Sequence, residues 1–154
     1  MSIKIQNKGK IDWDKNIDKI FGSKFRMICA QVIKKGIKDG LKSGKDINGT
    51  KFKKLKAATV KQKKKKGYKS PSKPLIATGM MSKLPPIKNK LNHSEVRTAK
   101  KREDIAVYHN RGMKPQPKRE WFGVSLDAKK NIGRAVAKKV VQILKRGYRL
   151  PTKL

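Results

Sequence analysis

The chain has very few acidic residues. Its 154 residues include 10 Asp and Glu against 43 Lys and Arg, which gives a formal net charge of +33. No acid occurs from position 47 to position 94, and none follows Asp127. A lone chain of this charge repels itself and attracts polyanions without sequence specificity. We therefore expect an anionic partner: a neighbouring subunit, an acidic protein or a nucleic acid.

Cysteine and long hydrophobic runs are also scarce. Cys29 is the only cysteine, so no disulfide can form within the chain, and a cytosolic or virion setting fits. No apolar run approaches the roughly 20 residues that span a membrane. The stretch from Met1 to Lys10 lacks the hydrophobic segment of a signal peptide. We expect no membrane partner.

The sequence lacks the residue sets of common active sites. The ten acids are scattered, and Glu103 with Asp104 is the only adjacent pair. His93 and His109 are too far apart for a local metal motif, and no cysteine accompanies them. A glycine-rich phosphate loop and a GxSxG motif are both missing. We therefore expect no enzymatic activity, no catalytic residue, no metal and no cofactor.

Two segments have the apolar spacing of amphipathic helices. From Asp12 to about Gly40, apolar residues recur at steps of three and four, namely Trp13, Ile17, Ile20, Phe21, Ile28 and Val32. Glycines at 36, 40 and 44 are expected to weaken the end of this helix. The second helix is predicted to follow Ser125, a good N-cap residue. Its apolar face repeats every four residues, at Ala128, Ile132, Val136, Val140 and Leu144, and its other face is basic.

Between these helices, the lysine-rich segment 47–90 is predicted to be an extended arm or loop. Its stretch KQKKKKGYKSPSKP has no periodicity and contains a glycine and two prolines. The lysines expected to contact DNA or other subunits are Lys61, Lys63, Lys64, Lys65, Lys66 and Lys69. One interpretation is a solvated linker, and the other is an arm that wraps a neighbour or lies along DNA.

From about position 91 to position 108 the pattern favours a β-hairpin. Alternating residues flank the charged stretch AKKRED on both sides, namely Val96, Thr98, Ile105 and Val107. The stretch EWFGV that follows could add a strand. Helices at both ends of a small antiparallel sheet predict an α+β fold, and the length predicts one domain over 1–154.

The stretch HNRGMKPQPKREWFGVS, residues 109–125, is dense in glycine, proline and aromatic residues; we call it the clasp segment. Its prolines fix φ and stiffen the connection, and a glycine permits a turn before the N-cap serine. Arg119 can attach the segment to a carboxylate or a carbonyl, while Trp121 and Phe122 are expected to be buried beneath the last helix. His109 is expected to be a hydrogen-bonded structural residue rather than a ligand.

Three pieces of the sequence, taken in order, resemble the phage virion morphogenesis family, the Mu-like tail-completion and head–tail joining proteins. The piece KDINGTKFKKLKAATVKQK is similar to the family's Asp-x-x-Gly, aromatic, Leu and Thr-x-x-x-Lys run at Asp46, Gly49, Phe52, Leu55, Thr59 and Lys63. PLIATGMMSK resembles its Leu-x-x-Thr-Gly element at Leu75, Thr78 and Gly79. The clasp segment resembles its histidine–glycine and proline–arginine–aromatic–glycine–serine stretch at His109, Gly112, Pro117, Arg119, Trp121, Phe122, Gly123 and Ser125.

This resemblance implies a structural protein of the virion, assembled in the host cytoplasm. It would act at the head–tail junction as a neck, tail-completion or tail-terminator protein and would form a homo-oligomeric ring around the DNA channel. Its implied partners are other phage neck, portal-adaptor or tail proteins, with sequence-independent contact to DNA in the channel. The alternative is a basic protein that coats nucleic acid, of ribosomal or nucleoid-like type. A nucleic-acid enzyme is disfavoured by the missing carboxylate cluster.

Overall fold

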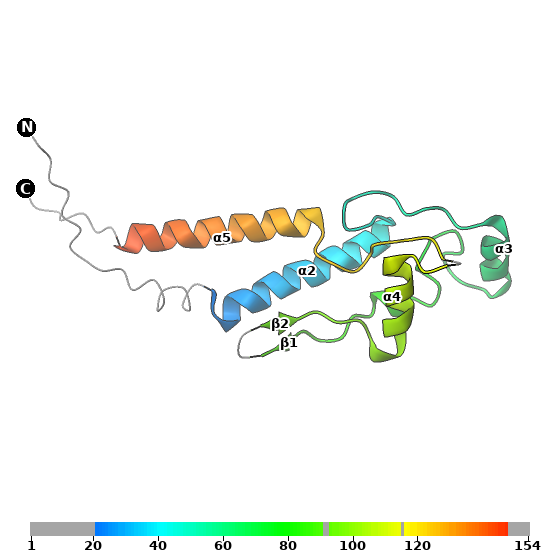
Figure 1. The fold of residues 1–154 in the computed structure, drawn as a ribbon, viewed down its shortest axis with the longest axis horizontal. Coiled ribbons are helices and arrows are strands. Elements are labelled where there is room, and N and C mark those ends of the chain that lie inside the picture. Colours follow the sequence, from blue (N-terminus) through cyan, green and yellow to red (C-terminus); the bar gives the residue numbers. More distant parts are fainter. Residues whose placement is uncertain (1–20, 91–92, 115, 148–154) are drawn as a thin grey trace, which may run out of the picture.

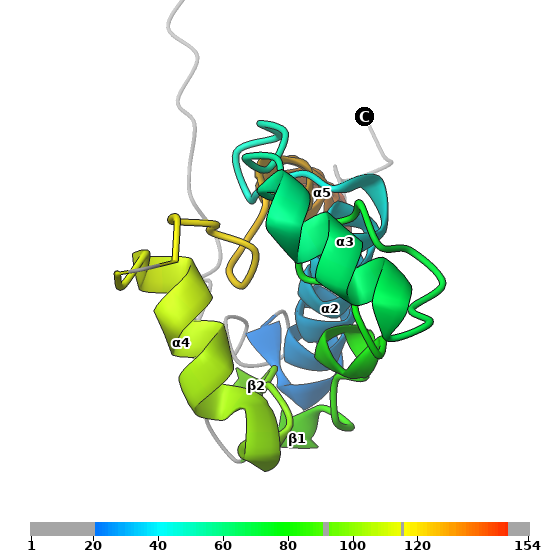
Figure 2. The same ribbon diagram turned by 90° about the vertical axis from the view of Figure 1, so that its right-hand side faces the viewer.

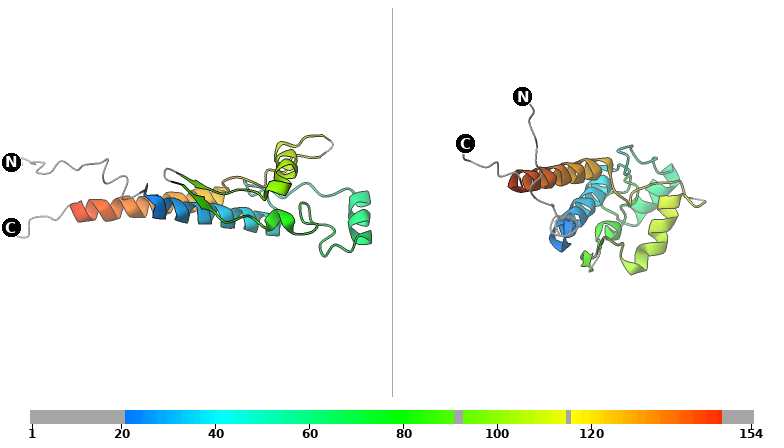
Figure 3. Two further views of the ribbon diagram at one scale, coloured as in Figure 1. Left: turned by 90° about the horizontal axis from the view of Figure 1, so that it is seen from below. Right: turned by 60° about the vertical axis from the view of Figure 1, so that its left-hand side comes forward.

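The computed structural model describes residues 21–90, 93–114 and 116–147. Two long helices, α2 (Ser23–Ser43) and α5 (Leu126–Gly147), run side by side in opposite directions (Figure 1). Two short helices, α3 (Ala57–Lys65) and α4 (Glu103–Arg111), lie towards the end of the molecule where α2 finishes (Figure 2). Seen from below, the long helices form a rod with the smaller elements gathered along one part of it (Figure 3). The fold is therefore of the α+β class, as predicted.

Helix α2 contributes one buried face and ends in a glycine cap. Ala30, Ile37 and Leu41 are its buried residues, spaced as a helical face requires. The helix ends at Gly44, whose φ of 71° is left-handed, and the amide of residue 45 donates to the carbonyl of residue 40 at 2.9 Å. The predicted helix is confirmed from residue 23 onward, but it does not run through Gly22, whose ψ of 176° is not helical; the proposed stretch 12–20 lies outside the described residues. Ile28 is 50% exposed and is not the core residue that the spacing predicted.

Helix α2 runs past two of the glycines expected to weaken its end and stops at the third, Gly44. The helix continues through Gly36 and Gly40 to Ser43. A Cβ added at Gly36 would lie 2.8 Å from the Ser125 hydroxyl. Gly36 therefore allows the beginning of α5 to approach α2 closely, which is a packing role that helix propensity does not reveal.

Helix α5 begins at the predicted cap, and its first half packs against α2. The Ser125 hydroxyl accepts a hydrogen bond from the amide of Ala128 at 3.2 Å. Ala128 is 2% exposed, and Ile132 and Val136 are partly buried. Further along the helix, apolar side chains lie in solvent: Val140 is 37% exposed. The predicted amphipathic helix is confirmed, but its apolar face is only half covered by the described residues.

The lysine-rich segment 47–90 is not uniformly extended. Residues Ala57–Lys65 form α3, a helix with no buried residue, and Met80–Ser82 form a short 3-10 turn. The side chain of Lys63 turns back from α3 and donates to the carbonyls of Ser70, Lys73 and Ile76, at 3.4, 2.7 and 2.7 Å. These bonds hold the loop that follows α3 against the helix. The prediction of an extended arm is therefore wrong for 57–65.

The hairpin exists, but it lies earlier in the chain than predicted. Strand β1 (Lys88–Asn89) pairs with β2 (Ser94–Glu95) in antiparallel register. The residues expected to form the returning strand, Ile105 and Val107, belong to helix α4 instead. Two acids open that helix, where the N-terminal dipole favours them, and Gly112 closes it with φ 72°. The stretch EWFGV adds no strand among the described residues.

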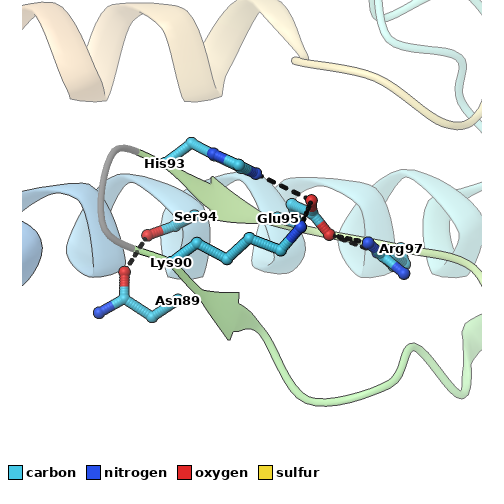
Figure 4. A network of polar contacts seen from close by, with 6 residues as sticks. All are labelled: Asn89, Lys90, His93, Ser94, Glu95 and Arg97. Atoms are coloured by element: carbon cyan, nitrogen blue, oxygen red, sulfur yellow. Dashed lines mark hydrogen bonds and ion pairs between the residues drawn. The ribbon is translucent and has the colours of Figure 1, made fainter.

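One carboxylate organises the charged side chains of the hairpin (Figure 4). Glu95 pairs with Lys90 at 3.2 Å, with His93 at 2.9 Å and with Arg97. Hydrogen bonds from His93 and Lys90, and then the Arg97 charge, lower the pKa of Glu95 to about 2. In a chain so rich in lysine, a single acid thus bonds to several basic side chains at once.

The buried core joins several segments that lie far apart in the sequence. Its buried cluster consists of Ile37, Leu41, Phe52, Leu84, Ala106 and Trp121. Partly buried side chains pack around this cluster, namely Ile33, Leu75, Met81, Val96 and Phe122. These residues come from α2, the lysine-rich segment, the stretch just after β2, α4 and the clasp segment, whereas no described residue of α3 or α5 belongs to the cluster.

Candidate functional site

The first of the three family-like pieces forms a tight turn that docks onto the clasp segment. The Asp46 carboxylate accepts hydrogen bonds from the amides of Asn48 and Thr50, at 2.9 and 2.8 Å, and Gly49 has a left-handed φ of 85°. Ile47 then donates to the Glu120 carbonyl at 2.9 Å. Its own carbonyl accepts from the amide at position 126, also at 2.9 Å. The turn is thus held by backbone bonds to both ends of the 120–126 stretch.

The clasp segment itself folds back on α4. Gly112 lies so close to Lys118 that an added Cβ would be 2.5 Å from the Lys118 Cβ and 2.7 Å from its Cα. The amide of Arg119 donates to the His109 carbonyl at 2.7 Å. Asn110 exchanges two hydrogen bonds of 3.1 Å with the backbone of Phe122. Half-buried Pro117 lies within this return, while the proline at 115 lies outside the described residues.

Two aromatic residues of the clasp segment pack edge to face. Trp121 is 2% exposed and belongs to the core, and the Phe122 ring lies 5.4 Å from it at an interplanar angle of 69°. Phe122 is only partly buried. At Gly123 the chain passes Ile47, whose Cδ1 would be 3.4 Å from an added Cβ. The stretch 121–123 therefore connects the core to the docked turn.

A cavity of about 290 Å³ brings residues of all three pieces together. The family-like residues that line it are Leu55, Thr59, Lys63, Leu75, Thr78, Gly79, His109 and Arg119. They come from three separate stretches of the sequence. Reasoning from the sequence did not single out the remaining lining residues, among them Met80, Arg102 and Ile105, and it had placed Ile105 on a strand. We call this the basic cavity and take it as the candidate site.

The charged groups that line the basic cavity are all cationic. Arg119 is 4% exposed, and its Nη2 donates to the Lys53 carbonyl at 3.2 Å, which is one of the two attachments predicted for it. Its Nε and the Nδ1 of His109 are buried without a hydrogen-bond partner among the described residues, so the hydrogen bond predicted for His109 is not found at Nδ1. Burial lowers the pKa of Arg119. Burial, followed by the nearby Arg119 charge, lowers the pKa of His109. No carboxylate belongs to the described lining.

The lysines singled out from the sequence divide into two groups. Five of them have exposed side chains: Lys61, Lys64, Lys65, Lys66 and Lys69. Lys63 differs, because it is partly buried, donates to three carbonyls, and has a pKa lowered by burial. The exposed five are free to contact an anionic partner, whereas Lys63 is committed to holding its own loop.

A larger cavity of about 520 Å³ lies between α2, α5 and the docked turn. It contains both signs of charge, with Asp39 and Asp127 beside Lys35 and Lys130, so it has no charge preference comparable to that of the basic cavity. Among the residues described, no group of three or more His, Cys, Asp or Glu side chains could hold a metal ion. In the same ranges, no helix has the length and apolarity needed to cross a membrane.

Comparison of the chain with protein-family models, with curated proteins and with solved structures finds no match.

Proposed function

We propose that this chain is a structural protein of a phage virion, located at the head–tail junction as a neck, tail-completion or tail-terminator subunit. In this proposal it assembles as a homo-oligomeric ring around the channel that DNA crosses. The observation that supports it best is the convergence of the three family-like pieces. Residues chosen by their resemblance to the family pattern line one cavity, and the first piece bonds to the clasp segment through the backbone of Ile47.

This convergence bears on the resemblance because chance matches have no reason to meet in space. Asp46 and Gly49 shape the turn that bonds to the clasp segment, and Gly112 permits the close return of that segment. Arg119 reaches back to the chain at Lys53, just before α3. We carry over the family's role on this resemblance as a proposal, since a fold by itself does not assign a function.

The described surface offers features that subunit assembly needs. Val140 and Val141 on the outer half of α5 are 37% and 48% exposed, and Ile28 on α2 is 50% exposed. Apolar side chains in such positions stabilise contacts between subunits when they are covered. However, identical subunits of charge +33 repel one another. The ring would therefore require anionic neighbours, which are acidic neck, portal-adaptor or tail proteins, or DNA.

The alternative function is a basic protein that coats nucleic acid. It is favoured by the five exposed lysines on and beyond α3, which no acid within 47–94 can neutralise. Lysine is a point charge suited to phosphate rather than to bidentate reading of bases, so such binding would be independent of sequence.

The deciding experiment measures assembly with nucleic acid removed. The protein is purified with nuclease treatment at high salt, and its mass distribution and negative-stain images are recorded. The virion role predicts closed rings of one defined stoichiometry, formed alone or with a purified phage neck or tail partner. A protein that stays monomeric in the absence of nucleic acid, and coats added DNA without fixed stoichiometry, would establish the alternative instead.

A pair of charge-matched variants locates the DNA-facing surface. The first changes the exposed lysines near α3 to glutamine, at Lys61, Lys64, Lys65, Lys66 and Lys69. The second changes five exposed lysines of α5, at Lys129, Lys130, Lys138, Lys139 and Lys145. For each phosphate that a variant no longer binds, the slope of log affinity against log salt should fall by about 0.9. Since both variants remove the same charge, a difference between their slopes identifies the surface that meets DNA.

A further inference from the structure

The basic cavity contains a buried positive charge without an acid to balance it. Arg119 is 4% exposed, and the physical cause of its lowered pKa is burial alone. Its Nη2 bond to the Lys53 carbonyl leaves Nε unsatisfied within the described ranges. A buried cation is normally paired, and an unpaired buried donor costs stability. In this respect the cavity is complementary to an anion.

The other charged and titratable groups of the cavity also favour an anion. The Nδ1 of His109, likewise unpartnered among the described residues, lies in the same lining, and Arg102 and Lys63 contribute further positive charge. Glu103, the acid next to Arg102 in the chain, lines a different cavity. An anionic group entering the basic cavity would therefore meet the positive charge of Lys63, Arg102 and Arg119 and no acid of the described lining.

The walls of the cavity decide between a protein anion and a nucleic-acid phosphate. About half of the lining residues are apolar, and two of these are exposed: Met80 by 37% and Ile105 by 38%. A phosphodiester backbone would press hydrated sugars and charges against these side chains, which is unfavourable. A carboxylate flanked by apolar side chains satisfies the cations and covers the walls at the same time.

We propose that the basic cavity is a docking site for an acidic side chain of another protein, presented on a short segment with apolar neighbours. The carboxylate is received by Arg119 and His109, and the flanking apolar groups lie against Met80, Ile105 and Leu75. A volume of about 290 Å³ is enough for a few side chains and not for a folded element. This site goes beyond the virion role, because it can exist whether or not the chain forms a ring.

The test uses two capped tripeptides, acetyl-Leu-Glu-Leu-amide and acetyl-Leu-Gln-Leu-amide, together with a random-sequence DNA duplex. Binding to the full chain is followed by NMR titration of the His109 ring and the Arg119 Nε, at about 0.3 M NaCl, where the Debye length is below about 8 Å. The glutamate peptide should bind about tenfold more tightly than the glutamine peptide, since a charge-assisted hydrogen bond distinguishes them. It should shift both resonances.

Two rim variants on the same helix make the test specific. Ile105→Glu places a carboxylate at the mouth of the basic cavity and should weaken binding of the glutamate peptide about tenfold or more. Val107→Glu is the matched control, because Val107 is also 38% exposed on α4 but lines the neighbouring cavity. It should leave peptide binding unchanged, and both variants should weaken DNA binding equally. Arg119→Gln removes a buried charge and can unfold the chain, so the rim variants decide the question.

Three outcomes would overturn the proposal. Equal binding of the two peptides, or no binding by either, would show that the cavity does not select a carboxylate. Equal effects of the two rim variants on the peptide would show that only overall charge matters. Shifts of His109 and Arg119 with the DNA duplex but not with the peptide would make the occupant a nucleic-acid phosphate. None of these outcomes depends on whether rings form. The peptide test can therefore fail while the ring-assembly test of the virion role succeeds, and the reverse.

Discussion

Gly112 is the position where a single added methyl group should have the largest effect for its size. Its φ of 72° is left-handed, and alanine in that conformation costs about 1–2 kcal/mol. In addition, the new Cβ would lie 2.5 Å from the Cβ of Lys118 and 2.8 Å from its backbone nitrogen. Because backbone atoms cannot rotate away, overpacking should add about 1–3 kcal/mol. We expect Gly112→Ala to lower the free energy of unfolding by about 2–5 kcal/mol.

Gly67 offers a control that isolates the steric clash from the backbone strain. Its φ is 70°, but nothing lies within 4 Å of an added Cβ. Gly67→Ala and Gly112→Ala therefore have the same left-handed strain, and both reduce the entropy of the unfolded chain. These two effects cancel when the stabilities of the two variants are compared. Urea unfolding at 25 °C should show Gly112→Ala to be less stable than Gly67→Ala by about 1–3 kcal/mol with similar m-values. If the two variants agreed within about 0.5 kcal/mol, the tight return of the clasp segment onto α4 would be refuted.

Three further predictions concern the core, the loop after α3 and the hairpin. Trp121→Ala should destabilise by about 3–5 kcal/mol and partly buried Phe122→Ala by about 3 kcal/mol in urea unfolding; a harmless Trp121→Ala would contradict its place in the core. Lys63→Gln should lower the free energy of unfolding by about 1–2 kcal/mol, because it removes the bonds to three carbonyls. The exposed control Lys64→Gln should change it by less than about 0.5 kcal/mol. Equal values for the two variants would mean that the Lys63 bonds do not stabilise the loop. The pKa of Glu95 falls from its usual 4.5 to about 2 on folding. The ionised Glu95 therefore adds to the free energy of unfolding above pH 4.5, and this stabilisation is lost as the pH falls towards 2. The urea midpoints of the wild type and Glu95→Gln should therefore converge over that range, and a constant gap would exclude the predicted linkage.

Local sequence signals predicted the two long helices correctly because those signals act over short distances. Ser125 caps α5 through its own hydroxyl, and the four-residue spacing through Ala128 reports the face that meets α2. The same reasoning failed at Ile105 and Val107, whose β-branched alternation resembles a strand. There the pair of acids before them and Gly112 after them favoured a helix, and these end signals outweighed the alternation.

Composition and periodicity were enough to predict the α+β class and the amphipathic character of α2 and α5, and the charge excess is the basis of the proposed anionic partner. They carry this information because each residue contributes to them independently of its distant neighbours. The folded chain was needed to show that Lys63 turns inward, that Gly36 lies against Ser125, and that Arg119 is buried in one cavity lining with His109 and no acid of the described residues. These features depend on contacts between segments far apart in the sequence, and no local pattern encodes which lysine or arginine loses its water when those segments meet.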